Sequence, residues 1–166
     1  MAGASLVWKS KSCSQADSNQ INDCWPTTSW AIVDYFLRPK PAYFAISREL
    51  RPYTVGMTRK EKKTFANDLS AAEFTIATIL EVWGTNSTLS DKPSKLEVTF
   101  FDLHSSRTAQ FSKDIVLAAN SSTELYSGDL PGQPVRTKQS EVPRVIIVSA
   151  RLLDASGTVL GRYSNW

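Results

Sequence analysis

Apolar and polar side chains alternate along the second half of the chain, and this alternation predicts β-strands. The clearest run is Lys95–Leu103, with Leu96, Val98 and Phe100 on one face and Glu97, Thr99 and Phe101 on the other. Further strand-like runs, separated by polar or Gly/Pro-containing turns, are Tyr53–Thr58, Phe74–Trp83, Ala109–Leu117, Thr123–Tyr126, Arg144–Leu153 and Thr158–Tyr163.

The number and spacing of these runs indicate the fold class. Seven short strands in about 115 residues are typical of an immunoglobulin-like antiparallel β-sandwich. A Cys…Trp…Cys signature is missing, so the sandwich is not of the antibody type. Asp154-Ala155-Ser156-Gly157 is predicted to close the last strand pair as a hairpin, with Gly157 supplying the positive φ that such a turn needs.

The first fifty residues have a different pattern, which predicts a helix from Pro41 to Leu50. Proline suits the first turn of a helix because its missing N–H would be unpaired there anyway. Tyr43, Ile46 and Leu50 recur at helical spacing, so we expect one buried stripe. Pro52 stops further winding.

Charge and hydropathy exclude several partners. The chain has 19 Lys and Arg against 16 Asp and Glu, and neither half carries the basic excess of a nucleic-acid-binding protein. The one basic cluster, Arg59-Lys60-Glu61-Lys62-Lys63, is interrupted by an acid and follows a predicted strand, so we expect a solvated loop. No apolar run approaches the roughly 20 residues of a membrane span, and no signal-peptide pattern opens the sequence. We therefore expect neither nucleic acid nor a membrane as partner.

The sequence has too few cysteine, histidine and clustered glycine residues to form a metal-binding or cofactor-binding site. Cys13 and Cys24 form neither a disulfide framework nor a four-ligand metal site. The single histidine, His104, follows a strand-like run and is expected on a surface turn. The seven glycines are scattered and form no phosphate-binding loop. We expect no metal and no organic cofactor.

Two segments resemble a known family. Residues 20–26 read Q-I-N-D-C-W-P and residues 38–45 read R-P-K-P-A-Y-F-A, and both closely resemble the end of the catalytic barrel in β-mannosidases of glycoside hydrolase family two. The resemblance implies that residues 1–50 are the terminal strand-loop-helix remnant of a (β/α)8 barrel, followed by an immunoglobulin-like β-sandwich domain over residues 51–166. Residues 9–19 depart from the family pattern, because they are polar and lack apolar periodicity, and are expected to be an unstructured insertion.

The resemblance also implies an activity. These enzymes remove terminal non-reducing β-D-mannose from β-mannosides by a retaining mechanism, which needs two carboxyl groups about 5 Å apart. In the family both groups are glutamates on earlier barrel strands, whereas the first glutamate here is Glu49. The chain alone is therefore expected to be inactive. Its implied partners are a β-mannoside or manno-oligosaccharide substrate, the missing barrel, and the small C-terminal β-domain that follows in the family.

Four residues are candidates for substrate binding, by resemblance. Trp8 ends the eighth barrel strand, where an aromatic ring stacks under the sugar. Asn22, Asp23 and Trp25 lie just beyond that strand, where barrel loops build active sites. The structural alternatives are a core role for Trp8 and support of the loop by the other three, with Asp23 capping the following turn.

A rival function stays open at this point. A free-standing β-sandwich that binds carbohydrate or protein without catalysis would need exposed, coplanar aromatic rings, and the candidates are Trp83, Tyr126, Tyr163 and Trp166.

Modification and compartment are also open. Asn86-Ser87-Thr88 and Asn120-Ser121-Ser122 both fit the N-glycosylation pattern, which matters only in a secreted protein. The similarity to fungal-type intracellular β-mannosidases favours the cytoplasm.

Overall fold

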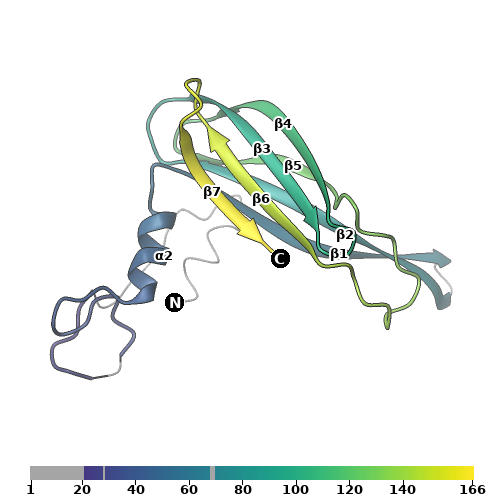
Figure 1. The fold of residues 1–166 in the computed structure, drawn as a ribbon, viewed down its shortest axis with the longest axis horizontal. Coiled ribbons are helices and arrows are strands. Elements are labelled where there is room, and N and C mark those ends of the chain that lie inside the picture. The colour runs from purple at the N-terminus through teal and green to yellow at the C-terminus, as the bar shows by residue number, and fades with distance from the viewer. Residues whose placement is uncertain (1–20, 28, 68–69) are drawn as a thin grey trace.

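The computed structural model describes residues 21–27, 29–67 and 70–166, as one helix followed by seven strands (Figure 1). Trp8 and residues 9–19 lie outside the described residues. The elements are α2 (Pro41–Glu49), β1 (Tyr53–Asn67), β2 (Ser70–Asn86), β3 (Lys92–Asp102), β4 (Arg107–Leu117), β5 (Ser121–Asp129), β6 (Ile146–Leu153) and β7 (Val159–Asn165).

The strands form two antiparallel sheets, with the orders β1-β2-β5 and β4-β3-β6-β7. All seven predicted strands exist, and the mainly β, immunoglobulin-like sandwich is confirmed. In a constant-type immunoglobulin domain the fourth strand belongs to the sheet of the first, second and fifth. Here β4 pairs with β3 instead, so the second sheet has four strands.

The core lies between the two sheets and follows the predicted alternation. Leu96, Val98 and Phe100 of β3 are at most 3% exposed, as expected for the inward face. The other sheet contributes buried apolar side chains to the same cluster, among them Val55, Met57, Leu80, Val82 and Leu125. Each such side chain stabilises the fold by about 1.5–3 kcal/mol on burial.

Two glycines have positions that other residues would not tolerate easily. Gly157 has φ +83° in the β6–β7 hairpin, so the predicted turn is confirmed. At Gly161 a Cβ atom would lie 3.1 Å from the Tyr53 carbonyl oxygen and 3.3 Å from the Thr54 Cα atom. The absence of a side chain at Gly161 thus lets β7 approach the backbone of β1, where the edges of the two sheets meet.

The loop expected at Arg59–Lys63 is wrong, because these residues lie within β1. The ladder with β2 continues from Arg59↔Leu80 to Phe65↔Phe74, and two of the five charges form ion pairs. Lys60 forms an ion pair with Glu81 at 2.7 Å, and Glu61 pairs with the buried Arg136. The outer parts of β1 and β2 consequently project beyond the other strands (Figure 1). We call residues 61–67 and 70–75 the arm.

Helix α2 begins at Pro41 as predicted, and the Leu50 N–H caps its end by donating to the Ile46 carbonyl at 2.9 Å. The expected buried stripe is wrong. Tyr43 is 42% exposed and Leu50 69% exposed, and none of the described residues of the helix is buried. The physical reason is that no described part of the chain covers this face of the helix.

Candidate functional site

Three of the four predicted site residues, Asn22, Asp23 and Trp25, lie in the segment that precedes α2. Backbone hydrogen bonds join three stretches of this segment, which lie around residues 23, 33 and 40. The Asp23 N–H donates to the Val33 carbonyl at 3.1 Å, and the Lys40 N–H donates to the Ile32 carbonyl at 2.9 Å. Residues far from the sandwich core are thus ordered by local pairing.

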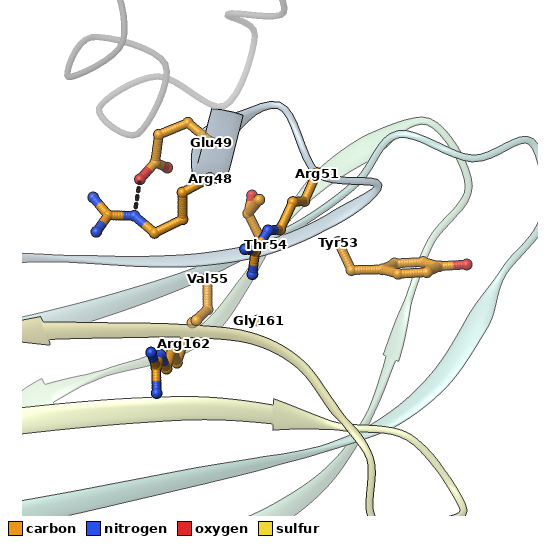
Figure 2. Close-up of a pocket in the computed structure, with 8 residues that line it drawn as sticks. All are labelled: Arg48, Glu49, Arg51, Tyr53, Thr54, Val55, Gly161 and Arg162. Carbon is orange, nitrogen blue, oxygen red and sulfur yellow. Dashed lines mark hydrogen bonds and ion pairs between the residues drawn. The ribbon is translucent and has the colours of Figure 1, made fainter. Parts of the chain in front are cut away.

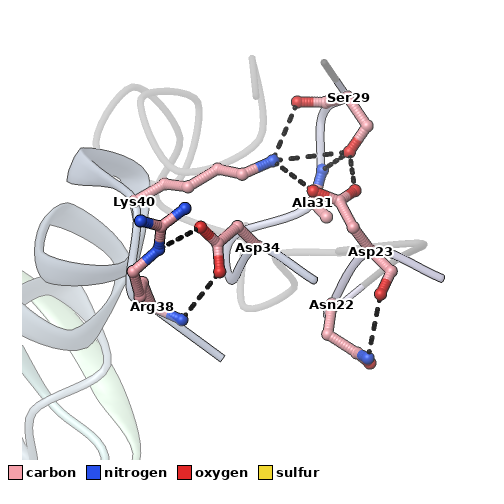
Figure 3. Close-up of polar contacts among 7 residues, drawn as sticks. All are labelled: Asn22, Asp23, Ser29, Ala31, Asp34, Arg38 and Lys40. Carbon is pink, nitrogen blue, oxygen red and sulfur yellow. Dashed lines mark hydrogen bonds and ion pairs between the residues drawn. The ribbon is translucent and has the colours of Figure 1, made fainter. Parts of the chain in front are cut away.

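Asp23 is the centre of a polar network (Figure 3). Its side chain is buried and accepts a hydrogen bond at 2.8 Å from the Lys40 ammonium group and another from the Ser29 hydroxyl. The Ser29 oxygen accepts in turn from the Ala31 N–H at 3.0 Å. The hydrogen bonds from Lys40 and Ser29 lower the pKa of Asp23, so the carboxylate stays ionised. Its two oxygens join residues that lie far apart in the sequence.

Asn22 and Trp25 are on the surface of the same segment. The Asn22 amide donates to the Asp23 carbonyl at 3.4 Å, and Trp25 is 66% exposed. The structure therefore brings Asn22 and Asp23 together but turns the Trp25 ring outward. Sequence reasoning missed Lys40 and Ser29 as partners of Asp23, because no helix or strand periodicity links residues at these separations.

A second ion pair stabilises the turn before α2 (Figure 3). Asp34 accepts hydrogen bonds from the backbone and the guanidinium of Arg38 at 2.8 and 2.7 Å. Burial raises the pKa of Asp34, but these bonds from Arg38 outweigh it, and the net shift is downward. Leu37 has φ +62° in this turn, an uncommon conformation for a residue with a γ-branched side chain.

The segment presents an unusually apolar exterior. Nine large side chains between residues 21 and 50 are 42–73% exposed, and we call them the N-terminal apolar surface: Ile21, Trp25, Trp30, Tyr35, Phe36, Leu37, Tyr43, Phe44 and Leu50. Exposed apolar side chains scattered singly are normal, whereas a concentration of them marks a contact surface.

The junction between α2 and the sandwich contains a small cavity of about 10 Å³ (Figure 2). Arg48, Glu49 and Arg51 line it from the helix end, and Gly161 and Arg162 line it from β7. Arg48 and Glu49 form an ion pair at 3.2 Å. Because its volume matches about one water molecule, the cavity is too small for a sugar ring. It is part of the joint between the helix and the sandwich.

The described acids of residues 21–50 all face cations. Asp23 pairs with Lys40, Asp34 with Arg38 and Glu49 with Arg48.

Other site types find no support in the part of the chain that the structure describes. No group of three or more His, Cys, Asp or Glu side chains gathers there as metal ligands would. His104 is exposed on the β3–β4 turn, as predicted. Within the same residues, every helix is too short or too polar to cross a membrane.

The four aromatic residues considered for a sugar-binding face do not form an exposed platform. Tyr126 and Tyr163 pack against the core, and Trp83 is half-buried. Trp166 is 83% exposed.

The two glycosylation triplets differ in accessibility. Asn86 is 1% exposed, and its amide donates to the Ser90 and Leu117 carbonyls at 2.8 and 3.0 Å. Asn120 is exposed on the β4–β5 turn with φ +44°. The Asn86 side chain is therefore structural, while Asn120 is open to solvent.

Comparisons with known proteins agree with this architecture. Over 168 residues the chain is 37% identical to β-mannosidase B of Thermothelomyces thermophilus. This match covers 99% of this chain and 18% of the relative. Over 170 residues it is 33% identical to β-mannosidase B of Aspergillus niger, covering 99% of this chain and 17% of the relative. The chain thus spans less than a fifth of the length of the curated relatives it matches.

Solved structures show the same fold. The crystal structure of a β-D-mannosidase from Dictyoglomus thermophilum matches with a TM-score of 0.62 at 24% identity, covering 89% of this chain and 15% of that chain. The family profile described as the mannosidase Ig/CBM-like domain matches residues 78–166, which is more than half of the sequence. The chain therefore belongs to the mannosidase Ig/CBM-like domain family.

Proposed function

We propose that this chain is a section of a retaining β-mannosidase that hydrolyses terminal non-reducing β-D-mannose residues. The observation that carries the proposal is the coverage of the relatives. Proteins named β-mannosidase B are similar to 99% of this chain, yet the chain accounts for only 17–18% of their length. In this proposal residues 1–50 complete a catalytic barrel, with residues 9–19 as an atypical insertion, and residues 51–166 form the immunoglobulin-like domain.

The chemistry assigns the catalytic groups to another part of the enzyme. Retaining hydrolysis needs a nucleophile and an acid/base carboxyl group about 5 Å apart. Asp23, Asp34 and Glu49 are each held by a cation, and Glu49 is the first glutamate of the sequence. The isolated chain is therefore inactive in this proposal, and no metal or organic cofactor takes part.

The N-terminal apolar surface supports this assignment. A barrel unit of strand, loop and helix buries its apolar side chains against its neighbours. Trp30, Phe36 and Phe44 are 61–72% exposed, which fits a unit whose neighbours are supplied by the rest of a barrel.

The proposal gives the loop residues distinct roles. Trp8, Asn22 and Trp25 contact the substrate in the assembled enzyme, with the exposed ring of Trp25 available to stack on a sugar. Asp23 acts as a positioning residue, because Lys40 and Ser29 occupy its carboxylate.

A chimeric enzyme tests the proposal. The section of Thermothelomyces thermophilus β-mannosidase B that aligns with this chain is replaced by this chain, and hydrolysis of p-nitrophenyl β-D-mannoside is measured for the chimera and for the chain alone. We expect activity in the chimera, with retention of the β-anomer by NMR, and none in the chain alone. Trp25→Ala in the chimera should raise KM.

Two outcomes contradict the proposal. Hydrolysis by the chain alone shows that the catalytic argument is wrong. A folded chimera without activity contradicts the enzyme assignment, and binding of manno-oligosaccharides by the chain in calorimetry then supports the alternative, a non-catalytic carbohydrate-binding module.

A further inference from the structure

Lys40 joins the start of helix α2 to the loop over residues 22–25. Its backbone N–H donates to the Ile32 carbonyl at 2.9 Å, and its ammonium group donates to the Asp23 carboxylate at 2.8 Å. The same ammonium group lies 3.4 Å from the Ser29 carbonyl oxygen and 3.5 Å from the Ser29 hydroxyl oxygen. Lys40 thus contacts three separate parts of the segment, while the next residue begins the helix.

Two prolines restrict the backbone at Lys40. A residue that precedes proline is confined to extended conformations, because the proline ring would clash with it in the α region. Pro41 follows Lys40, whose φ of −80° and ψ of 163° lie in the extended region. Pro39 precedes Lys40 and forms a bridge with Val33. The Pro39-Lys40-Pro41 sequence therefore limits the directions in which the Lys40 side chain can leave the backbone.

The loop over residues 22–25 is held both by its backbone and by the Asp23 side chain. The Val33 N–H donates to the Ile21 carbonyl at 2.9 Å, and the Val33 carbonyl accepts from the Asp23 N–H at 3.1 Å. The Asp23 carboxylate accepts hydrogen bonds from Lys40 and Ser29 (Figure 3). Because Asp23 lies within the loop, its position determines where the neighbouring side chains of the loop lie.

Burial makes this arrangement sensitive to the charge of Lys40. The Asp23 side chain is 1% exposed and the Lys40 side chain 25% exposed. A buried carboxylate that loses its cation is an uncompensated charge, and this is strongly unfavourable. Without Lys40 the carboxylate should move toward water and carry residues 22–25 with it. The Arg38–Asp34 ion pair is more exposed, so its loss should cost much less.

We propose that Lys40 is a positioning residue for substrate binding. It fixes the Asp23 carboxylate and thereby keeps Asn22 and Trp25 in the orientation that binds the sugar. The proposal rests on the proposed function, which places Asn22 and Trp25 at the substrate. It adds that the start of helix α2 controls the affinity of the site without direct contact between Lys40 and the sugar, because Asp23 and Ser29 occupy the ammonium group.

Kinetics of the chimeric β-mannosidase test this role, with p-nitrophenyl β-D-mannoside as the substrate. Lys40→Met should raise KM about tenfold and leave kcat within about twofold, because the proposed function places the catalytic carboxyl groups in another part of the enzyme. A loss of folded enzyme would instead lower kcat at unchanged KM. Lys40→Arg retains the cation and should restore most of the affinity. The control Arg38→Met removes an exposed cation from the same segment and should leave both constants within about twofold.

Two further variants separate positioning from other causes. Asp23→Asn removes the charge from the other partner of the ion pair and should raise KM to a similar extent. The result then does not depend on a single substitution. In a Trp25→Ala background, Lys40→Met should raise KM by a smaller factor than in the parent chimera, because one of the side chains that Lys40 positions is already missing.

The outcomes distinguish this proposal from the proposed function. An active chimera whose KM is unchanged by Lys40→Met and Asp23→Asn overturns the positioning role and leaves the enzyme assignment intact. A lower kcat at unchanged KM also overturns it, because the ion pair is then purely structural. Equal factors with and without Trp25 show that Lys40 does not act through that ring, which overturns the proposed route. A folded chimera without activity contradicts both proposals.

Discussion

The sandwich and the segment over residues 21–50 differ in the exposure of their large apolar side chains. The sandwich encloses a cluster of buried residues from both sheets, whereas the segment exposes nine large apolar side chains and buries the carboxylate of Asp23. The sandwich is therefore stabilised by its own core. The segment is ordered by two ion pairs and a few backbone hydrogen bonds, and its apolar surface requires a partner for burial.

Removing a core side chain should have the largest effect. Leu96→Ala takes away a fully buried side chain from β3 and should lower the free energy of unfolding by about 2–5 kcal/mol. The control Leu89→Ala changes a side chain that is 91% exposed and should stay within about 0.5 kcal/mol. Urea unfolding followed by tryptophan fluorescence measures both. Equal effects would contradict the assignment of the core.

Removing the buried side-chain amide of Asn86 should have the second-largest effect on the free energy of unfolding. Asn86→Ala leaves the Ser90 and Leu117 carbonyls without their donor and should cost about 1–3 kcal/mol of unfolding free energy. The other glycosylation triplet provides the control, since Asn120→Gly places glycine at φ +44° on an exposed turn and should change stability by less than about 0.5 kcal/mol. If both variants behave alike in urea unfolding, the structural role of Asn86 is wrong.

Breaking the Asp23 network should affect the segment without affecting the sandwich. Lys40→Met retains much of the chain length but removes the cation from a buried carboxylate, so amides of residues 21–33 should exchange roughly tenfold faster. The urea midpoint of the sandwich should not change. Arg38→Met removes a partner whose side chain is 72% exposed and should have a smaller effect on exchange. A shift of the sandwich midpoint in Lys40→Met would show that the two regions unfold together.

Lowering the pH should produce the smallest and most gradual difference in stability between the sandwich and the segment. Hydrogen bonds from the Ser105 and Ser156 side chains respectively lower the pKa values of Asp102 and Asp154 in the sandwich, and those from Lys40 and Ser29 lower that of Asp23. A lowered folded-state pKa contributes stability above the ordinary value of 3.8, and this contribution disappears as the pH falls through the folded-state pKa.

The urea midpoint should therefore stay level between about pH 5 and 7 and fall below about pH 4. Exchange in residues 21–40 should respond to acid before exchange in β3 and β6, because the segment has no apolar core. Asp102→Asn should flatten the acid dependence of the urea midpoint. An unchanged slope in that variant would contradict the role of Asp102.

Much of the sandwich was predictable because its signals are local. The alternation of Leu96, Val98 and Phe100 predicts a half-buried strand, and Gly157 predicts the last hairpin, and both are confirmed. The length of β1 was not predictable from local signals. Charged residues at 59–63 resemble a loop, and only pairing with β2 and with Glu81 and Arg136 makes a strand of them.

The candidate site was less predictable from the sequence than the sandwich was. The resemblance of residues 20–26 and 38–45 points to the segment, but it does not show that Lys40 and Ser29 enclose Asp23. The helical spacing of Tyr43, Ile46 and Leu50 predicts the helix correctly and its burial wrongly. Periodicity reports which side chains share a face, and burial depends on what else covers that face.

Alternation, turn residues and specific motifs act over short distances along the chain, so the strand and helix types, the sandwich class and the family could be predicted from the amino-acid sequence. The folded arrangement was needed to show which charges meet, which asparagine is buried, how far the arm projects and which apolar residues stay exposed. Those features depend on contacts between residues that are distant in the sequence, and no local pattern encodes such contacts.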